Sequence, residues 1–227
     1  KLLEEENDDE EYEAAVVAKG LAKAANLLSE KYHWVITNVP YLARGKQSER
    51  LCEFCDTYHK AAKNDLATVF LDRCLQMCEH GGTCSMVLPQ NWLFLTSYKK
   101  LREKLLNNAC WHIIARLGPG AFDTISGEVV KATLLNISNK KVKYANSFLS
   151  QKEKGEPSWS ICGLDVSESR SVQEKAENII IFNIKYVKQS KQLDNPSSVI
   201  SLERNNGEIL LNKYASALQG ISTSDNP

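Results

Sequence analysis

The stretch Trp34-Val35-Ile36-Thr37-Asn38-Val39-Pro40-Tyr41 decides the interpretation of the rest of the chain. Its apolar part, residues 33–37, predicts a short buried strand that ends at Asn38. An amide, a backbone stiffened by proline and an aromatic ring then follow at the tip of that strand. Ligands of open α/β sheets bind beyond the carboxyl ends of the strands, so we expect a site here for a planar, amino-bearing base.

The remainder of the chain alternates between helical and extended patterns, which predicts a doubly wound α/β sheet with parallel pairing and right-handed crossovers. A further alternating segment, residues 128–137, has no helix before it and predicts an antiparallel strand beside its predecessor or successor. In chain order, the other expected elements are a helix over 11–30, a helix over 65–79 that ends at Gly81-Gly82, a strand over 85–89, a helix over 97–107 and a strand over 111–117.

The periodicity weakens from Lys140 onward, which indicates a change of organisation at that point. Neither end of the chain has the pattern of a natural terminus, so we expect an internal fragment. The predicted division is a helix that leads into the core over residues 1–31, a catalytic domain over 32–139, and a linker with the start of a second, less regular domain over 140–227.

Composition excludes several classes of protein. Lys and Arg (28) balance Asp and Glu (28), so any contact with nucleic acid must come from a local patch. No stretch approaches the roughly 20 apolar residues of a membrane span, and no signal peptide is found. The 7 scattered cysteines fit reduced thiols in a cytoplasm. Cys52-x-x-Cys55 has the spacing of zinc ligands, but free cysteines are commonly buried, and we expect no metal.

Several motifs follow one another in a fixed order. Asn38-Val39-Pro40-Tyr41 resembles motif IV, usually Asn-Pro-Pro-Tyr, of the DNA methyltransferases that act on amino groups. Asp65-Leu66 with Phe70 resembles motif V, and Gly81-Gly82 through Asn91 resembles motif VI. The segment 117–130 resembles the motif VIII region of the adenine-specific methyltransferases of BREX phage-defence systems, and 219–226 resembles the beginning of their target-recognition domain.

This resemblance implies the fold and the chemistry. The fold is the C-terminal half of a Rossmann-like class I methyltransferase, with a mostly parallel sheet and a final antiparallel strand. The reaction is direct methyl transfer from S-adenosylmethionine to the N6 amine of a flipped adenine. By resemblance, the Asn38 side chain and the Val39 carbonyl accept hydrogen bonds from that amine, Tyr41 stacks on the base, and Phe122 is the candidate for its opposite face.

The resemblance also implies the partners. These are double-stranded DNA and other defence-system proteins, with no membrane involved. Asp65 would lie near the adenine moiety of the cofactor, although Asn64-Asp65 is also an ordinary helix N-cap signal. Basic residues that could contact DNA phosphates cluster late in the chain: Lys131, Lys140, Lys141 and Lys143.

Two features leave alternatives open. Val39 replaces the usual proline, which keeps a backbone carbonyl but loses the restriction of φ. The chain also lacks the glycine-rich loop that holds the cofactor's amino-acid end, so we expect most of the cofactor site to lie outside it and the fragment alone to be inactive. The alternatives are a non-catalytic scaffold of a defence complex, or a methyltransferase acting on RNA or on a protein glutamine.

Overall fold

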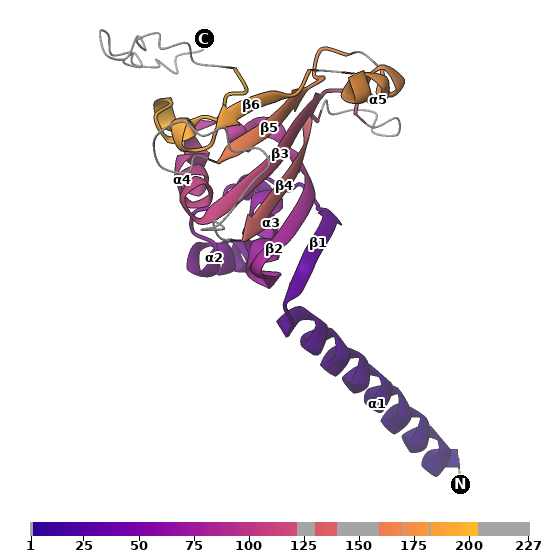
Figure 1. Ribbon diagram of the computed structural model, residues 1–227. Helices are drawn as coiled ribbons and strands as arrows, with labels where there is room; N and C mark the ends of the chain where they lie inside the picture. Colours follow the sequence, from indigo (N-terminus) through magenta and orange to yellow (C-terminus); the bar gives the residue numbers. More distant parts are fainter. Residues whose placement is uncertain (1, 122–129, 140–158, 170, 182, 204–227) are drawn as a thin grey trace, which may run out of the picture.

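A computed structural model describes residues 2–121, 130–139, 159–169, 171–181 and 183–203 of the chain. These residues form one six-stranded mixed sheet, flanked by helices (Figure 1). The strands lie in the spatial order β1 (Tyr32–Asn38), β2 (Cys78–Pro89), β4 (Ala132–Asn139), β3 (Ala109–Gly118), β5 (Ser160–Asp165) and β6 (Lys185–Lys188).

Pairing in the sheet is parallel in two places and antiparallel in three. β1 pairs with β2 in parallel, as the helical crossover between them predicts, and β3 pairs with β5 in parallel. β4 runs antiparallel between β2 and β3, which confirms the antiparallel strand expected over residues 128–137, although its start is later. β1, β2, β3 and β5 therefore run in the same direction, as expected for a mostly parallel sheet with a final antiparallel strand, but β4 separates β2 from β3, and β6 is a second antiparallel strand that was not expected.

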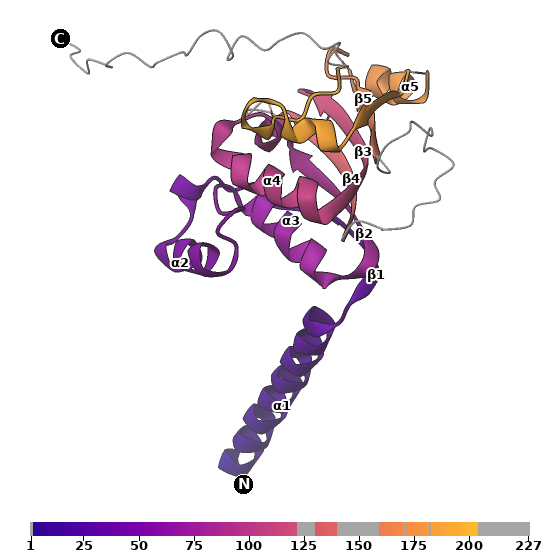
Figure 2. The same ribbon diagram turned by 60° about the vertical axis from the view of Figure 1, so that its left-hand side comes forward.

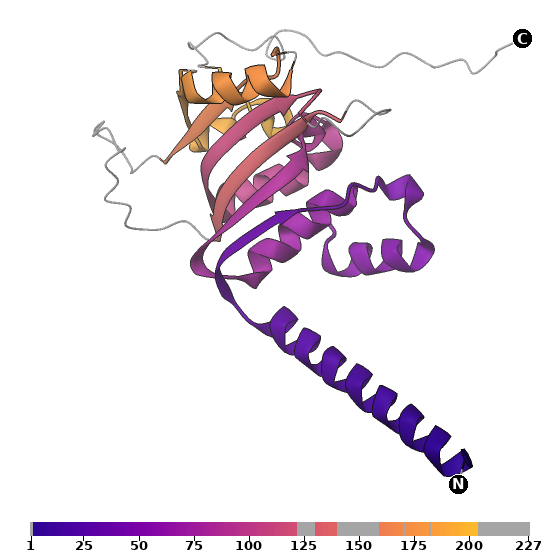
Figure 3. The ribbon, with the colours of Figure 1, turned by 90° about the vertical axis from the view of Figure 1, so that its right-hand side faces the viewer.

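Two helices, α3 (Leu66–Met77) and α4 (Lys99–Asn108), cover the same face of the sheet (Figure 2). Figure 3 shows both of them behind the strands. The main core lies under them and includes Met86, Leu88 and Ile137. The opposite face of the central strands exposes Leu134 and Ile113, and α5 (Val172–Ile181) lies on that side of the sheet (Figure 3). Helices thus lie on both sides of the sheet, as a doubly wound fold predicts, although the described residues leave part of the second face open.

The strand β1 forms where the sequence predicts it, but the prediction that it is buried is wrong. Trp34 and Ile36 are 61% and 69% exposed. Their partners across the pairing are Thr83 and Ser85, on the face of the sheet that α3 and α4 leave open. Only the other face of β1 packs against the core, through Val35. β1 is also an edge strand among the described residues.

The glycines Gly81 and Gly82 do not end a helix, in contrast to the prediction. α3 ends at Met77, and both glycines lie inside β2. A Cβ on Gly82 would come 2.8 Å from the Tyr32 carbonyl oxygen, so glycine permits the close approach of the two strands. A second helix, α2 (Glu49–Tyr58), was not predicted; the Ser48 side chain caps it.

The helix predicted over residues 11–30 is confirmed and begins earlier, as α1 (Leu2–Ser29). It projects away from the sheet (Figure 1), and its described side chains are exposed. The Arg73 guanidinium donates to the Leu28 carbonyl at its last turn. Within the described residues, no helix is both long enough and apolar enough to cross a membrane.

The described residues after 140 extend the same sheet. β5 and β6 add to it beyond β3, and α5 (Val172–Ile181) lies between them in sequence. Buried Gln189 binds this region to the core, since its amide donates to the Leu106 and Ala109 carbonyls and accepts from the Trp111 N–H. The predicted beginning of a second domain after residue 139 stays a prediction, but β5 and β6 belong to the same sheet as β1 to β4.

Candidate functional site

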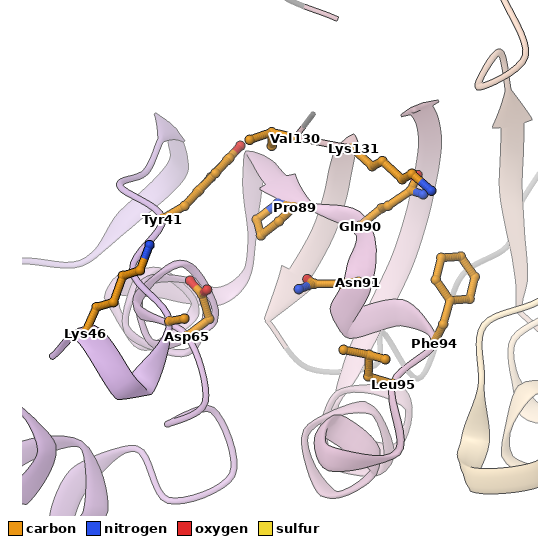
Figure 4. Close-up of a pocket in the computed structure, with 11 residues that line it drawn as sticks. Tyr41, Lys46, Asp65, Pro89, Gln90, Asn91, Phe94, Leu95, Val130 and Lys131 are labelled. Atoms are coloured by element: carbon orange, nitrogen blue, oxygen red, sulfur yellow. The ribbon is translucent and has the colours of Figure 1, made fainter. Parts of the chain in front are cut away.

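A cavity of about 460 Å³ opens where β1 and β2 end (Figure 4). It has two walls. The first wall is formed by Tyr41, Ala43 and Lys46 after β1 and by Asp65 just before α3. The second wall is formed within residues 89–95, at and just after the end of β2, and it lies beside Val130 and Lys131, just before β4. The cavity therefore lies at the carboxyl ends of two parallel strands, as open α/β sheets predict.

The first wall is held by backbone hydrogen bonds. The Leu66 N–H donates to the Leu42 carbonyl (2.9 Å), and the Arg44 N–H donates to the Asn64 carbonyl (3.0 Å). Val39 is 6% exposed and packs in the core. These contacts fix the turn that follows Asn38 and carry it toward α3.

Tyr41 is half-buried on the first wall, and its phenol lines the cavity. Its Oη is buried and has no hydrogen-bond partner in the described structure. Burial, together with the nearby Asp65 carboxylate, raises the pKa of the Tyr41 phenol, so it stays protonated at neutral pH. A ligand in the cavity would therefore contact a neutral aromatic ring.

Asp65 contributes a carboxylate to the same wall. Its Oδ1 accepts from the Ala67 N–H (2.8 Å), which confirms the predicted N-cap of α3. The Leu42 N–H points at the same oxygen at 3.4 Å. Oδ2 makes no hydrogen bond among the described residues, and the side chain lines the cavity, so the carboxylate can both cap the helix and accept from a ligand.

The second wall is held by a fully buried guanidinium. Arg102 of α4 donates to the Trp92 carbonyl and to the Leu95 carbonyl (2.8 Å), and it also donates to Ser197 and Ser198. Trp92 itself is fully buried and belongs to the core, so it does not line the cavity. The side chains of Asn91 and Leu95 point into the cavity (Figure 4).

The structure brings only some of the predicted site residues together. Tyr41, Asp65 and Lys131 line the same cavity. Asn38 is exposed as the last residue of β1 and, like Val39 and Pro40, is not among the residues that line the cavity. The remaining candidates lie outside the described residues: Phe122, Lys140, Lys141 and Lys143.

Sequence reasoning assigned no role to several residues that line the cavity. Gln90 and Phe94 come from the second wall, and Lys46 comes from the first. The available signal was the Pro89-Gln90-Asn91 stretch at the end of a predicted strand, the same position at which Asn38 was recognised. Arg102 was not foreseen as a support, since its partners at Ser197 and Ser198 are far away in the chain.

The cysteines gather elsewhere, away from the cavity. Cys74, Cys78 and Cys84 are buried between α3 and β2. Hydrogen bonding to the other two thiols, with burial, raises the pKa of the Cys84 thiol, which therefore stays neutral. In the part of the chain that the structure describes, no group of three or more His, Cys, Asp or Glu side chains is arranged to hold a metal ion.

Comparison with known proteins identifies the class. Residues 1–122, more than half of the chain, match the family described as Eco57I restriction-modification methylase, and the chain belongs to that family. It is 29% identical over 221 residues to the adenine-specific methyltransferase PglX of Lacticaseibacillus casei (strain Zhang). It is 34% identical over 134 residues to the adenine-specific methyltransferase BrxX of Escherichia coli O9:H4 (strain HS).

The matches cover most of this chain and little of its relatives. The aligned regions are 92% of the chain for PglX and 59% for BrxX, but they span only 17% and 11% of those proteins. Among solved structures, the chain resembles a type I restriction-modification methyltransferase subunit from Streptococcus thermophilus, with a TM-score of 0.51, 14% identity, and coverage of 75% of this chain and 37% of that one. The DrdV–DNA complex gives a TM-score of 0.52 at 14% identity, with coverage of 77% and 19%. At these identities the likeness shows a shared methyltransferase fold.

Proposed function

We propose that the protein containing this chain transfers a methyl group from S-adenosylmethionine to the N6 amine of an adenine flipped out of double-stranded DNA. The setting would be restriction-modification or BREX phage defence. Membership of a methylase family and the two adenine-specific relatives support this proposal. The observation that carries it is the cavity at the ends of β1 and β2. It is lined by a tyrosine whose hydroxyl has no hydrogen-bond partner among the described residues, by amide side chains and by a carboxylate.

An adenine inside a duplex hides its amine, so an enzyme that methylates it must extrude the base and hold it by stacking and edge contacts. Tyr41 is half-buried on one side of the cavity and offers the stacking face. Asn38, three residues earlier at the tip of β1, would accept one amine hydrogen through its side-chain oxygen. The Val39 carbonyl would accept the other, and both contacts keep electron density on the nitrogen that attacks the methyl group.

The valine at position 39 is compatible with this role. Its side chain is 6% exposed and packs among core residues, so packing restrains the backbone at the position where a proline ring would restrain it. The hydrogen-bond acceptor in the proposal is the main-chain carbonyl, which valine retains. This supports the enzyme over the scaffold alternative.

When bound, S-adenosylmethionine would supply a methyl group from its sulfonium sulfur: the methyl–sulfur bond would break as the methyl–nitrogen bond forms, S-adenosylhomocysteine would leave, and the amine would release one proton, with no covalent enzyme intermediate. The donor set fits one part of this cofactor: Asp65 keeps an oxygen without a hydrogen bond among the described residues, and it lines the cavity. That oxygen would accept from the amine of the cofactor's adenine. We expect this chain alone to be inactive and to bind the cofactor too weakly for a calorimetric titration, because it lacks a glycine-rich loop for the amino-acid end.

Contacts to the DNA backbone are proposed for the basic residues. Lys131 is exposed at the rim of the cavity, next to the position of the base. An ammonium group there can neutralise a phosphate flanking the flipped nucleotide. The same role is proposed for Lys140, Lys141 and Lys143.

The test is transfer of a tritiated methyl group to unmethylated DNA by the full-length protein, followed by identification of the methylated base. The expected product is N6-methyladenine, and Asn38→Ala should reduce the rate roughly 100-fold or more, the effect of losing one preorganised hydrogen bond to the reacting group. Asn107→Ala is the matched control, because it removes an exposed amide that bonds only within α4. Equal incorporation by Asn38→Ala and the control would contradict the role of Asn38, and label found only in RNA or protein would contradict the substrate.

A further inference from the structure

We propose that the side-chain amide of Gln90 contacts the edge of the flipped adenine and donates a hydrogen bond to one of its ring nitrogens. The inference rests on the proposed function and deepens it, since it adds a base-contacting residue to the second wall of the cavity. Gln90 would then recognise the base from the side of the cavity opposite Tyr41.

The first step is the place of Gln90 in the cavity. It directly follows β2 and lines the cavity together with Lys131, on the far side from Tyr41 and Asp65 (Figure 4). Its backbone N–H donates to the Lys131 carbonyl at 2.7 Å, which joins the end of β2 to the start of β4. A base held against Tyr41 would therefore turn an edge toward Gln90.

The second step is the unmet hydrogen-bonding capacity of this amide. Gln90 is 8% exposed, and its Oε1 is buried without any hydrogen-bond partner in the described structure. The described structure also holds no hydrogen bond donated by Nε2. Most polar side-chain atoms inside proteins have a partner, so this free donor calls for an explanation. A ligand that brings a hydrogen-bond acceptor into the cavity would supply the partner of Nε2.

The third step is rigidity. Pro89 precedes Gln90 with its φ fixed at −64°, and a short 3₁₀ turn, η2 (Gln90–Leu93), follows. The buried Arg102 holds that turn through the Trp92 carbonyl. The backbone that carries Gln90 is therefore positioned before any ligand arrives, as base recognition requires.

The fourth step is chemical complementarity. In the proposed function, Asn38 and Val39 take the two hydrogens of the adenine amine, which leaves the ring nitrogens as acceptors in need of a donor. The Gln90 amide is a neutral donor in the cavity, whereas Lys46 and Lys131 are exposed cations suited to phosphate. Amide side chains also pair with the edge of adenine in protein–DNA complexes.

The test combines changes in the protein with changes in the base. The methylated position is first located with the full-length protein on plasmid DNA. Initial rates are then measured on duplexes that carry adenine, 1-deazaadenine, 3-deazaadenine or 7-deazaadenine at that position. The variants are Gln90→Met, which keeps length but cannot hydrogen-bond, and Gln90→Glu, which keeps shape but presents only acceptors. Gln76→Met, at an exposed glutamine of α3, is the control.

For the unaltered protein and the control, we expect the methylation rate to be about tenfold lower on one of the three deaza substrates than on adenine, which is the effect of one hydrogen bond. Both Gln90 variants should be about tenfold slower on adenine and should lose nothing further on that same deaza substrate. If Gln90→Met does not fold, as judged by its thermal unfolding, Gln90→Glu decides. If the Gln90 variants still lose about tenfold in rate on that deaza substrate, the proposed role of Gln90 is wrong, and the proposed function is unaffected. Absence of transfer by the unaltered protein to any DNA would overturn the proposed function as well.

Discussion

The two walls of the cavity are built from similar lengths of chain after neighbouring parallel strands, but they are held in different ways. The first wall relies on backbone hydrogen bonds and on the buried Asp65 side chain, whose partners Leu42 and Ala67 lie within or next to that wall. The second wall relies on Arg102, which is fully buried. The first wall can therefore adjust locally to a ligand, whereas the second is tied to the core and to a distant part of the chain.

The support of the second wall reaches across the molecule. Burial lowers the pKa of Arg102, but the group remains charged because an arginine starts from a very high value. Its partners Ser197 and Ser198 both have φ of +53°, a conformation that non-glycine residues rarely adopt. In addition, the Ile200 N–H donates to the Leu93 carbonyl at 3.0 Å. One guanidinium thus fixes both the cavity wall and the turn at residues 196–199.

Replacement of Arg102 should have the largest effect. Arg102→Met removes a donor from four carbonyls, of which only Leu95 keeps another among the described residues, the Tyr98 N–H. We therefore expect the free energy of local opening around residues 90–101 to fall by about 3 kcal/mol. Hydrogen exchange of peptides from the full-length protein measures this, with the amide of Ile200 as a further reporter. Arg50→Met, at an exposed arginine of α2, is the control. A change below about 1 kcal/mol would show that the second wall does not depend on Arg102.

The sequence was sufficient for features that depend on neighbours in the chain. The strand before Asn38, the N-cap at Asp65 and the antiparallel strand ending near Ile137 follow from local periodicity and capping signals. Tyr41 was expected beyond the carboxyl end of a strand, and it lines the cavity there.

Features that depend on distant contacts could not be predicted in this way. Trp34 and Ile36 have the apolar character of buried residues, yet their exposure depends on what covers that face of the sheet. Gly82 was predicted to stop a helix because nothing local reveals the approach of Tyr32. The support of the second wall depends on Arg102 reaching residues about 95 positions later, which no local pattern encodes.

A substitution of Tyr98 tests whether the two walls are linked electrostatically. It is 5% exposed, and burial, with the Asp65 carboxylate of the first wall, raises its pKa to about 12 from the ordinary 10.0. The native state therefore holds the phenolic proton more tightly than the unfolded chain does. This stabilisation is fully present below pH 10 and is lost as the pH rises toward 12.

We expect the free energy of unfolding to fall by about 2 kcal/mol more in the unaltered chain than in Tyr98→Phe between pH 9 and pH 12. Urea unfolding at several pH values measures the difference, with Tyr12→Phe on the exposed α1 as the matched control. Parallel pH profiles for the unaltered chain and Tyr98→Phe would mean that Tyr98 ionises as easily when folded as when unfolded, and that the walls are not electrostatically linked there.

Asp65 should give the smallest change in stability, and it separates two roles of the first wall. Asp65→Ala removes the cap of α3 and should lower the free energy of local opening at the Ala67 amide by about 1 kcal/mol, measured by hydrogen exchange. Asp65→Asn keeps an acceptor at the cap and should change it by only a few tenths of a kcal/mol. If Asp65 also contacts the cofactor, Asp65→Asn should still raise the KM for S-adenosylmethionine in the full-length protein, since a neutral amide accepts a hydrogen bond less strongly than a carboxylate does. An unchanged KM would leave Asp65 as a cap alone, and the first wall would then hold the base without taking part in binding the methyl donor.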